Sequence, residues 1–257
     1  MKVILSPAKS INENVDCSHL TCTQHLFQDE SQRLAGKLAK LSARQIKKLM
    51  GVSQDIADLN YNRFQEWSLP FTPENSKPAG IIFTGAAYQS LDFASLSKKE
   101  MEVGQEKLRI LSGLYGMLKP LDLIQPYRLE MGTSFKVTPK VTNLYKFWGD
   151  KLRNKLQEEL NESNSSVLVN AASNEYSKAL NLSKLDTKII TTVFKDRSKT
   201  GEYKVNMQFA KLSRGAMARY IIENDLEKEE DLKGFDTGGY SFSSKDSSEL
   251  EYVYLRG

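Results

Sequence analysis

The sequence predicts an α/β protein folded as one domain, with a central mixed sheet surrounded by helices. Short apolar runs bounded by turn residues alternate irregularly with longer amphipathic segments along the 257 residues. Residues 188–194 and 202–210 flank a turn-rich loop and are expected to pair antiparallel, which makes the sheet mixed. No internal repeat or low-complexity linker divides the chain, so residues 1–257 are expected to form a single domain.

Short apolar runs mark the expected strands. The first, KVIL, is stopped by the sequence SPAK, and the others end in similar turn-forming residues. The expected strands cover residues 2–5, 80–83, 167–170, 188–194, 202–210, 239–242 and 250–255.

Capping residues mark several of the expected helices. Ser42 and Ser53 precede amphipathic segments as N-cap residues, and Gly51 is placed to end the first of these two helices. Ser97 and Ser213 are expected to begin two later helices in the same way. The expected helices cover residues 27–41, 42–51, 53–67, 97–113, 143–160 and 213–224.

Composition is that of an ordinary globular protein, with 40% hydrophobic and 26% charged residues. No apolar run approaches the roughly 20 residues that a membrane helix needs. The apolar run before Pro7 is too short for a signal peptide. Cys17 and Cys22 are the only cysteines, which agrees with a reducing compartment. We therefore expect a cytoplasmic protein with no membrane partner.

Charge is distributed unevenly around a net value of +4. Residues 1–50 and 101–220 carry an excess of Lys and Arg, whereas residues 221–257 carry an excess of Asp and Glu. A basic region can attract phosphate polymers. The alternative, which charge by itself favours, is that the two signs face each other or water.

The sequence LSGLYG, with Gly113 and Gly116, raises a choice between a capped helix end and a ligand loop. A helix C-cap explains Gly113 but not Gly116, which follows the apolar Leu114 and Tyr115. Apolar and glycine residues alternating between helices are typical of a helix-hairpin-helix element, whose backbone N–H groups face a DNA phosphate. Lys119 would add a cation beside that phosphate.

Pro120 is a departure from that pattern, since it falls where the second helix should run and removes a backbone donor. The second helix would therefore be short, displaced or distorted. From the local pattern the capped turn stays the favoured alternative.

Downstream residues offer further phosphate ligands. In an extended chain Arg128 and Glu130 lie on one side, so Glu130 could orient Arg128 toward a phosphate or simply pair with it. Lys211 and Arg214, at i and i+3, could share one helix face toward a phosphate or toward solvent.

The sequence NAASNEY follows an expected strand end, where α/β proteins place ligand groups. It supplies Asn170 and Glu175, although Ser173 could equally cap the next helix. With Lys9, Arg128 and Glu130, these polar groups could line the cleft of an enzyme acting on a phosphate-bearing or nucleic-acid substrate.

The chain lacks the common catalytic and nucleotide-binding motifs, namely G-x-G-x-x-G, the P-loop, H-E-x-x-H and G-x-S-x-G. All its Cys and His residues, Cys17, His19, Cys22 and His25, fall within nine positions. That spacing is cramped for a tetrahedral metal site, so a polar loop is the favoured interpretation. We therefore predict no metal and no cofactor, and the sequence identifies no catalytic residue.

Five segments together resemble the YaaA family of bacterial peroxide-stress proteins. They are ILSPAK, LSGLYGMLKPLDLIQPYRLEMG, LYKFWGD, NAASNEY and ARYIIEN, and they span nearly the whole chain. The resemblance implies an unusual α/β domain in the cytosol, resistance to hydrogen peroxide and limitation of free iron. It also implies DNA binding, with a helix-hairpin-helix element over residues 108–124. It implies no catalytic activity, and no metal role for the Cys and His cluster.

The leading hypothesis is therefore a non-enzymatic protein that binds double-stranded DNA independently of sequence and limits iron-dependent oxidative damage. The expected contacts are Gly113, Leu114, Tyr115, Gly116, Lys119, Arg128, Lys211 and Arg214. An enzyme with the cleft described above and an iron-handling protein are the alternatives.

Overall fold

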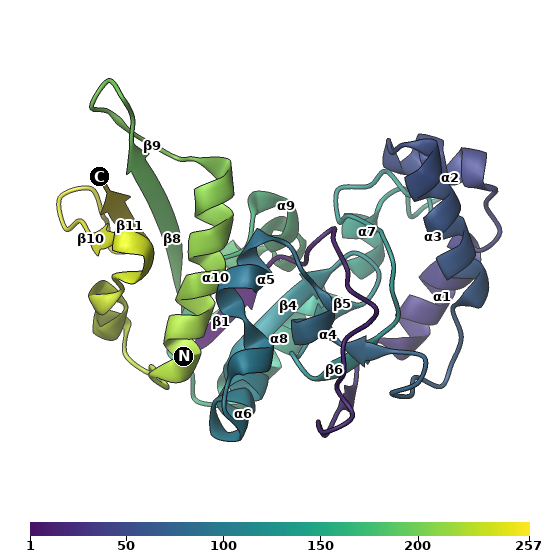
Figure 1. Ribbon diagram of the computed structural model, residues 1–257, viewed down its shortest axis with the longest axis horizontal. Helices are drawn as coiled ribbons and strands as arrows, with labels where there is room; N and C mark the ends of the chain where they lie inside the picture. Colours follow the sequence, from purple (N-terminus) through teal and green to yellow (C-terminus); the bar gives the residue numbers. More distant parts are fainter.

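A mixed eight-stranded sheet crosses the molecule in the computed structural model, which describes residues 1–257 (Figure 1). Its strands are β1 (Lys2–Leu5), β4 (Leu108–Ser112), β5 (Gly116–Leu118), β7 (Val167–Asn170), β8 (Lys188–Arg197), β9 (Tyr203–Lys204), β10 (Ser241–Phe242) and β11 (Glu251–Arg256). The spatial order is β10-β11-β8-β7-β1-β4-β5, with β9 paired to β8. The five strands from β11 to β4 are parallel, and β5, β9 and β10 are antiparallel to their neighbours. The predicted α/β class with a mixed sheet is confirmed.

A second sheet is small and has three strands in the order β2-β6-β3. These strands are β2 (Thr23–Gln24), β3 (Lys77–Pro78) and β6 (Asp122–Ile124). It ties the N-terminal loop to the segment that follows β5, because β2 runs parallel to β6.

Ten α-helices pack around the sheets. They are α1 (Gln28–Leu38), α2 (Ala43–Met50), α3 (Gln54–Glu66), α4 (Ala79–Ile82), α5 (Ala86–Leu91), α6 (Lys98–Lys107), α7 (Leu144–Trp148), α8 (Lys151–Glu162), α9 (Asn174–Ser177) and α10 (Met207–Glu223). Figure 1 shows α1, α2 and α3 gathered at one end of the molecule, opposite the end that holds β10 and β11. None of the helices is long and apolar enough to cross a membrane.

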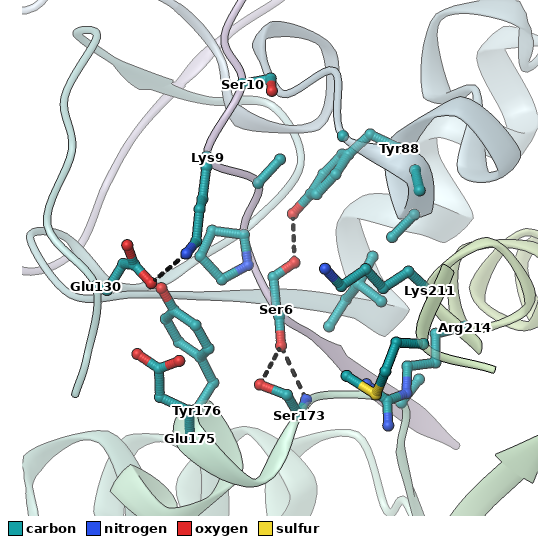
Figure 2. Close-up of a pocket in the computed structure, with 18 of the residues that line it drawn as sticks. Ser6, Lys9, Ser10, Tyr88, Glu130, Ser173, Glu175, Tyr176, Lys211 and Arg214 are labelled. Atoms are coloured by element: carbon teal, nitrogen blue, oxygen red, sulfur yellow. Dashed lines mark hydrogen bonds and ion pairs between the residues drawn. The ribbon is translucent and has the colours of Figure 1, made fainter. Parts of the chain in front are cut away.

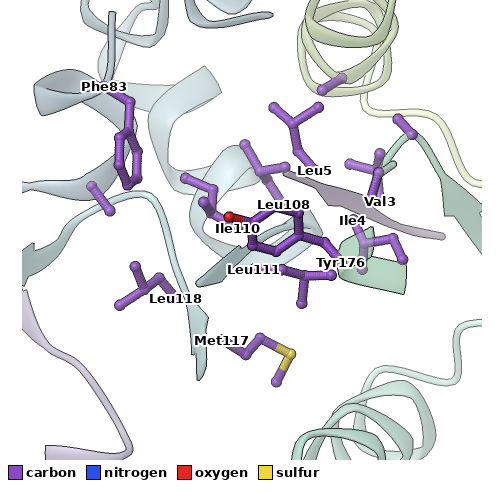
Figure 3. Packing of buried hydrophobic residues seen from close by; sticks show 14 of the residues in the cluster. Val3, Ile4, Leu5, Phe83, Leu108, Ile110, Leu111, Met117, Leu118 and Tyr176 are labelled. Carbon is purple, nitrogen blue, oxygen red and sulfur yellow. The ribbon is translucent and has the colours of Figure 1, made fainter. Parts of the chain in front are cut away.

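The three central parallel strands β1, β4 and β7 are buried on both faces, so their sequences are mostly apolar rather than alternating. In β1, Val3 and Leu5 point to one side and Ile4 to the other (Figure 3). Helix α10 contacts β1 and packs along α5 on one face. On the β4 side, Arg109 pairs with Glu159 of α8. One continuous cluster of 62 buried residues joins these layers.

The predicted helix caps at Ser42, Gly51 and Ser53 are confirmed. Ser42 forms a capping box with Gln45, and Gly51 ends α2 in the left-handed conformation with φ of 62°. The Ser53 side chain accepts a hydrogen bond from the Ile56 N–H at the start of α3. Ser97 caps α6 in the same way as Ser42 caps α2.

Several element predictions were wrong, and each has a local cause. Residues 80–83, expected as a strand, belong mostly to the short helix α4. The helix expected over 143–160 is broken at Gly149, whose φ of 51° ends α7. The strand expected over 202–210 stops at Lys204, because the Asn206 side chain caps α10 at Gln208 and Phe209. Ser213 is therefore not a cap and lies inside that helix.

The most consequential error concerns residues 108–112, which were expected to continue a helix. The helix α6 ends at Lys107, and residues 108–112 form the central strand β4. Gly113 and Gly116 bound a tight turn that returns the chain as β5, with Ser112 opposite Gly116. A β-hairpin therefore stands where the helix-hairpin-helix element was expected.

Candidate functional site

A cavity of about 680 Å³ opens at the carboxyl ends of β1 and β7. The next strand of this sheet along the chain, β4, lies on one side of β1, and β7 lies on the other side. Such a point of divergence in a parallel sheet is where α/β proteins place their ligands. Five segments line the cavity, at residues 5–10, 85–88, 127–130, 171–176 and 207–214.

Ser6, the first residue after β1, holds the loops at the base of the cavity together (Figure 2). Its hydroxyl accepts a 2.9 Å hydrogen bond from the Ser173 N–H and donates to the Ser173 hydroxyl over 3.3 Å. Its carbonyl oxygen accepts a 3.0 Å hydrogen bond from the Tyr88 hydroxyl. The Ser173 hydroxyl donates no hydrogen bond within the protein, so this donor is free for a ligand.

Glu130 joins two cations on one wall. Its two carboxylate oxygens accept from the Lys9 ammonium at 2.7 Å and from the Arg128 guanidinium at 3.0 Å. The Nε atom of Arg128 is buried and has no acceptor. The predicted association of Arg128 with Glu130 is thus present as an ion pair, with part of the guanidinium still unsatisfied.

Glu175 closes the same wall from the short helix α9, which follows β7. Its carboxylate accepts a 2.8 Å hydrogen bond from the Gly132 N–H. A β-carbon at position 132 would lie 3.1 Å from that carboxylate, so glycine permits the close approach. The Glu175 carbonyl oxygen accepts from the Tyr145 hydroxyl at 2.9 Å.

Lys211 and Arg214 enter the cavity from α10, and neither forms an ion pair or a hydrogen bond. Figure 2 shows Lys211 reaching toward Ser6, with Arg214 one turn further along. Lys211 is exposed, whereas Arg214 is half-buried. Burial lowers the pKa of the Arg214 guanidinium. A cation in that position without a counter-ion favours an anionic ligand.

Close packing of α10 against α5 places these two cations. A β-carbon on Gly215 would lie 1.7 Å from the Ala87 carbonyl oxygen, so only glycine allows the observed separation. On the other side of α5, a β-carbon on Gly85 would lie 2.8 Å from the Ala8 side chain. The loop after β1, α5 and α10 therefore pack closely at these two glycines.

Three tyrosines, Tyr88, Tyr127 and Tyr176, line the inner part of the cavity. Burial raises the pKa of each hydroxyl above its ordinary value. They therefore stay neutral and act as hydrogen-bonding and packing groups rather than as bases. The charge of the site comes from its four cations and two carboxylates.

The structure brings together six of the residues predicted from the sequence. Lys9, Arg128, Glu130, Glu175, Lys211 and Arg214 all line the cavity. Asn170 lies just below it and is buried, where its side chain accepts from the Ala172 N–H and supports the loop. Lys119 lines a different hollow, together with Lys2 and Arg109.

The Gly113–Gly116 turn is buried and does not reach the cavity, which corrects its expected role as a phosphate contact. Leu114 and Tyr115 have no exposed surface, and their N–H groups donate to the Ser112 hydroxyl. The Gly113 carbonyl oxygen accepts from the Trp148 indole at 3.1 Å. A β-carbon on Gly116 would lie 2.8 Å from Trp148, so both glycines serve packing.

The four Cys and His side chains of the N-terminal loop do not form a metal site. No three His, Cys, Asp or Glu side chains are placed to hold one ion together. Cys17 and His25 are buried, whereas His19 is exposed. The Nε2 atom of His25 contacts the Ser31 hydroxyl at 3.1 Å.

Sequence reasoning missed Ser6, Tyr88 and Met207 as cavity residues. Ser6 follows a buried strand directly, so the argument applied to Asn170 at the end of β7 could have found it. Tyr88 and Met207 carry no comparable pattern, because their place depends on how α5 and α10 pack.

Comparisons with known proteins cover the whole chain. Residues 1–246 match the family model described as "Peroxide stress protein YaaA". A UPF0246 protein of Hahella chejuensis is 45% identical over 256 residues, which cover 100% of this chain and 99% of the relative. UPF0246 proteins of Aliivibrio fischeri and Neisseria meningitidis are 47% and 45% identical, each over 100% of this chain and 98% of the relative. The chain thus belongs to the peroxide stress protein YaaA family.

Proposed function

We propose that this protein acts in the peroxide response by binding the phosphate backbone of double-stranded DNA at the cavity between β1, β7 and α10. The observation that carries the proposal is the pair Lys211 and Arg214, which line the cavity with no acidic partner. Lys9 and Arg128 add positive charge on the facing wall. Contacts of this kind reach phosphate rather than base edges, so the binding is independent of sequence.

The proposed consequence is protection of DNA against iron-dependent oxidation. Membership of the family supports a role in the peroxide response. A protein seated on the backbone would shield the sugars beneath it. The proposal differs from the sequence-based one in its contacts, since the buried Gly113–Gly116 turn takes no part.

The binding test compares variants of matched charge. Fluorescence anisotropy of a labelled duplex is measured across salt for wild type, Lys211→Gln/Arg214→Gln and Lys47→Gln/Lys48→Gln. Lys47 and Lys48 are exposed on α2 and outside both cavities described here. Each phosphate contact contributes about 0.9 to the slope of log K against log salt, so the first double variant should lose about 2 from that slope. Equal affinity and slope in both double variants would contradict the proposal.

The protection test uses supercoiled plasmid exposed to ferrous iron and hydrogen peroxide. Wild-type protein should reduce strand nicking in proportion to the DNA that it covers, and the Lys211→Gln/Arg214→Gln variant should not. Nicking that both proteins reduce equally would assign the protection to something other than this contact.

An enzyme acting on a phosphate-bearing substrate is a second candidate, because Glu130 and Glu175 line the same cavity as the cations. Both carboxylates are engaged, Glu130 by two cations and Glu175 by the Gly132 N–H. A catalytic role requires one of them to be released when substrate binds. Chromatography of nucleotides and DNA fragments incubated with the protein tests this candidate, with Glu175→Gln as the comparison.

A further inference from the structure

Four groups in the cavity offer hydrogen-bond donors that the protein does not satisfy. They are the Lys211 ammonium, the Arg214 guanidinium, the Nε atom of Arg128 and the hydroxyl hydrogen of Ser173. Arg128, Ser173 and Arg214 are half-buried, and donors in such positions are normally paired in folded proteins. Since all four groups are donors and three of them are cationic, a partner rich in acceptor oxygens would satisfy them.

The charge balance defines the partner further. The cavity is lined by the cations Lys9, Arg128, Lys211 and Arg214 and by the carboxylates Glu130 and Glu175. This leaves two positive charges. A phosphate monoester carries about −1.5 to −2 at pH 7 and three acceptor oxygens, whereas a backbone phosphodiester carries only one negative charge.

The size and walls of the cavity define the rest of the ligand. Its volume of about 680 Å³ lies within the 300–1,000 Å³ range of small-molecule sites. A phosphate fills only part of that space. Pro7, Ala8 and Ala86 line it from the loop after β1 and from α5, and Met207 lines it from α10. These apolar groups suit a sugar and a base.

We propose that the cavity binds a phosphate monoester of nucleotide size, with its phosphate held by Arg214, Lys211 and Ser173. The sugar and base lie along the apolar wall. This inference rests on the proposed function and deepens it, because the monoester is either a free mononucleotide or the 5′-phosphorylated end of a DNA strand. At a DNA end, the strand would enter the cavity while the duplex lies across its mouth.

The first experiment is calorimetric titration of the full chain with adenosine 5′-monophosphate, and with adenosine as the comparison. The nucleotide should bind, and adenosine should bind at least tenfold more weakly. Arg214→Gln should raise the Kd of the nucleotide about tenfold to hundredfold, since it removes a hydrogen bond to a charged group. Ser173→Ala should raise it about threefold to tenfold.

Controls separate binding from folding. Lys48→Gln removes an exposed cation far from the cavity and should leave the Kd unchanged. Thermal unfolding of each variant shows whether it is folded at the titration temperature. If Arg214→Gln is not folded there, Ser173→Ala still provides the test. Equal binding of adenosine and its monophosphate, or unchanged affinity in folded Arg214→Gln and Ser173→Ala, would overturn the inference.

The second experiment identifies the source of the monoester. Duplexes with 5′-phosphate or 5′-hydroxyl ends are compared, each with the mononucleotide as competitor. Preference for 5′-phosphate ends, with displacement by the mononucleotide, assigns the site to DNA ends. Mononucleotide binding that does not displace DNA assigns it to a free nucleotide.

The two proposals fail in different ways. Duplex binding without any mononucleotide binding or 5′-phosphate preference overturns the monoester site and leaves the proposed function standing. Mononucleotide binding without duplex binding overturns the proposed function and leaves the monoester site standing.

Discussion

The backbone at Gly113 lies directly against the backbone at Leu129, so that a β-carbon on Gly113 would be 2.3 Å from the Leu129 carbonyl oxygen. Leu129 stands between Arg128 and Glu130, which both line the cavity. The Gly113–Gly116 turn, which was expected to bind phosphate, therefore packs behind the segment that lines the cavity. It sets the path of the segment that carries an arginine and a carboxylate.

The contact predicts that Gly113→Ala destabilises the protein. The added methyl group meets a backbone oxygen that cannot rotate away, so the free energy of unfolding should fall by about 3 kcal/mol, within the usual cost of overpacking. Urea denaturation measures the change. Gly36→Ala is the matched control, because nothing lies within 4 Å of its β-carbon position in α1. That control should be more stable by up to about 1 kcal/mol. Equal stability of Gly113→Ala and wild type would contradict the contact.

Gly215→Ala should separate α10 from α5. Its β-carbon would lie 1.7 Å from the Ala87 carbonyl oxygen, so the helices must move apart or the chain must unfold. We expect a loss of about 3 kcal/mol or more in the free energy of unfolding. In the molecules that stay folded, ligand affinity should also fall, because Lys211 and Arg214 move with α10. Denaturation and ligand titration at low temperature measure the two effects, and retention of full affinity would show that this spacing does not position the cations.

The buried pair Arg109 and Glu159 joins β4 to α8 at 2.5 Å. Arg109 is 2% exposed, so removal of its partner leaves an uncompensated buried charge. We expect Glu159→Gln to lower the free energy of unfolding by about 3–5 kcal/mol. The double replacement Arg109→Met/Glu159→Leu should be much closer to wild type, since it removes both charges. A double variant that is as unstable as the single one would show that the pair contributes through packing instead.

His25 predicts a loss of stability at acidic pH. Burial lowers the pKa of His25 to about 4, from an ordinary value of 6.5. The unfolded chain therefore binds a proton between pH 6.5 and pH 4 that the folded protein excludes, so stability decreases as the pH falls through this window. The loss attributable to His25 should reach about 3 kcal/mol at pH 4.

Denaturation of wild type and His25→Gln at several pH values isolates that contribution, because the carboxylates titrate in both. His19→Gln is the control for the removal of a histidine, since His19 is exposed. The chain has only two histidines, so the two variants also assign both imidazole signals in an NMR titration. A His25 signal that titrates near 6.5 would contradict its neutral, buried state.

Local signals in the sequence predicted the elements that depend on local chemistry. Ser42, Gly51 and Ser53 cap their helices through contacts within one turn, so the pattern alone sufficed. Residues 108–112 were mistaken for helix because a short apolar run fits a buried strand and a buried helix equally. Their pairing with β1, about a hundred residues away, decided the outcome.

The site residues also fall into those that local pattern predicted and those that it misassigned. Lys211 and Arg214 were found because they are charged and share a helix face, and that face does line the cavity. Gly113 and Gly116 were misassigned because glycine marks close backbone approach without saying what approaches. At Gly113 the neighbour is the Leu129 backbone, and at Gly116 it is the Trp148 ring.

The segments that line the cavity determine at what stage of synthesis the site can form. The wall joins a loop that begins at Leu5 to a helix face that ends at Arg214, with three further segments drawn from between them. No fragment that stops short of α10 contains Lys211 or Arg214, so a nascent chain cannot form the proposed site until that helix has left the ribosome. The site is therefore among the later parts of the chain to be completed during synthesis.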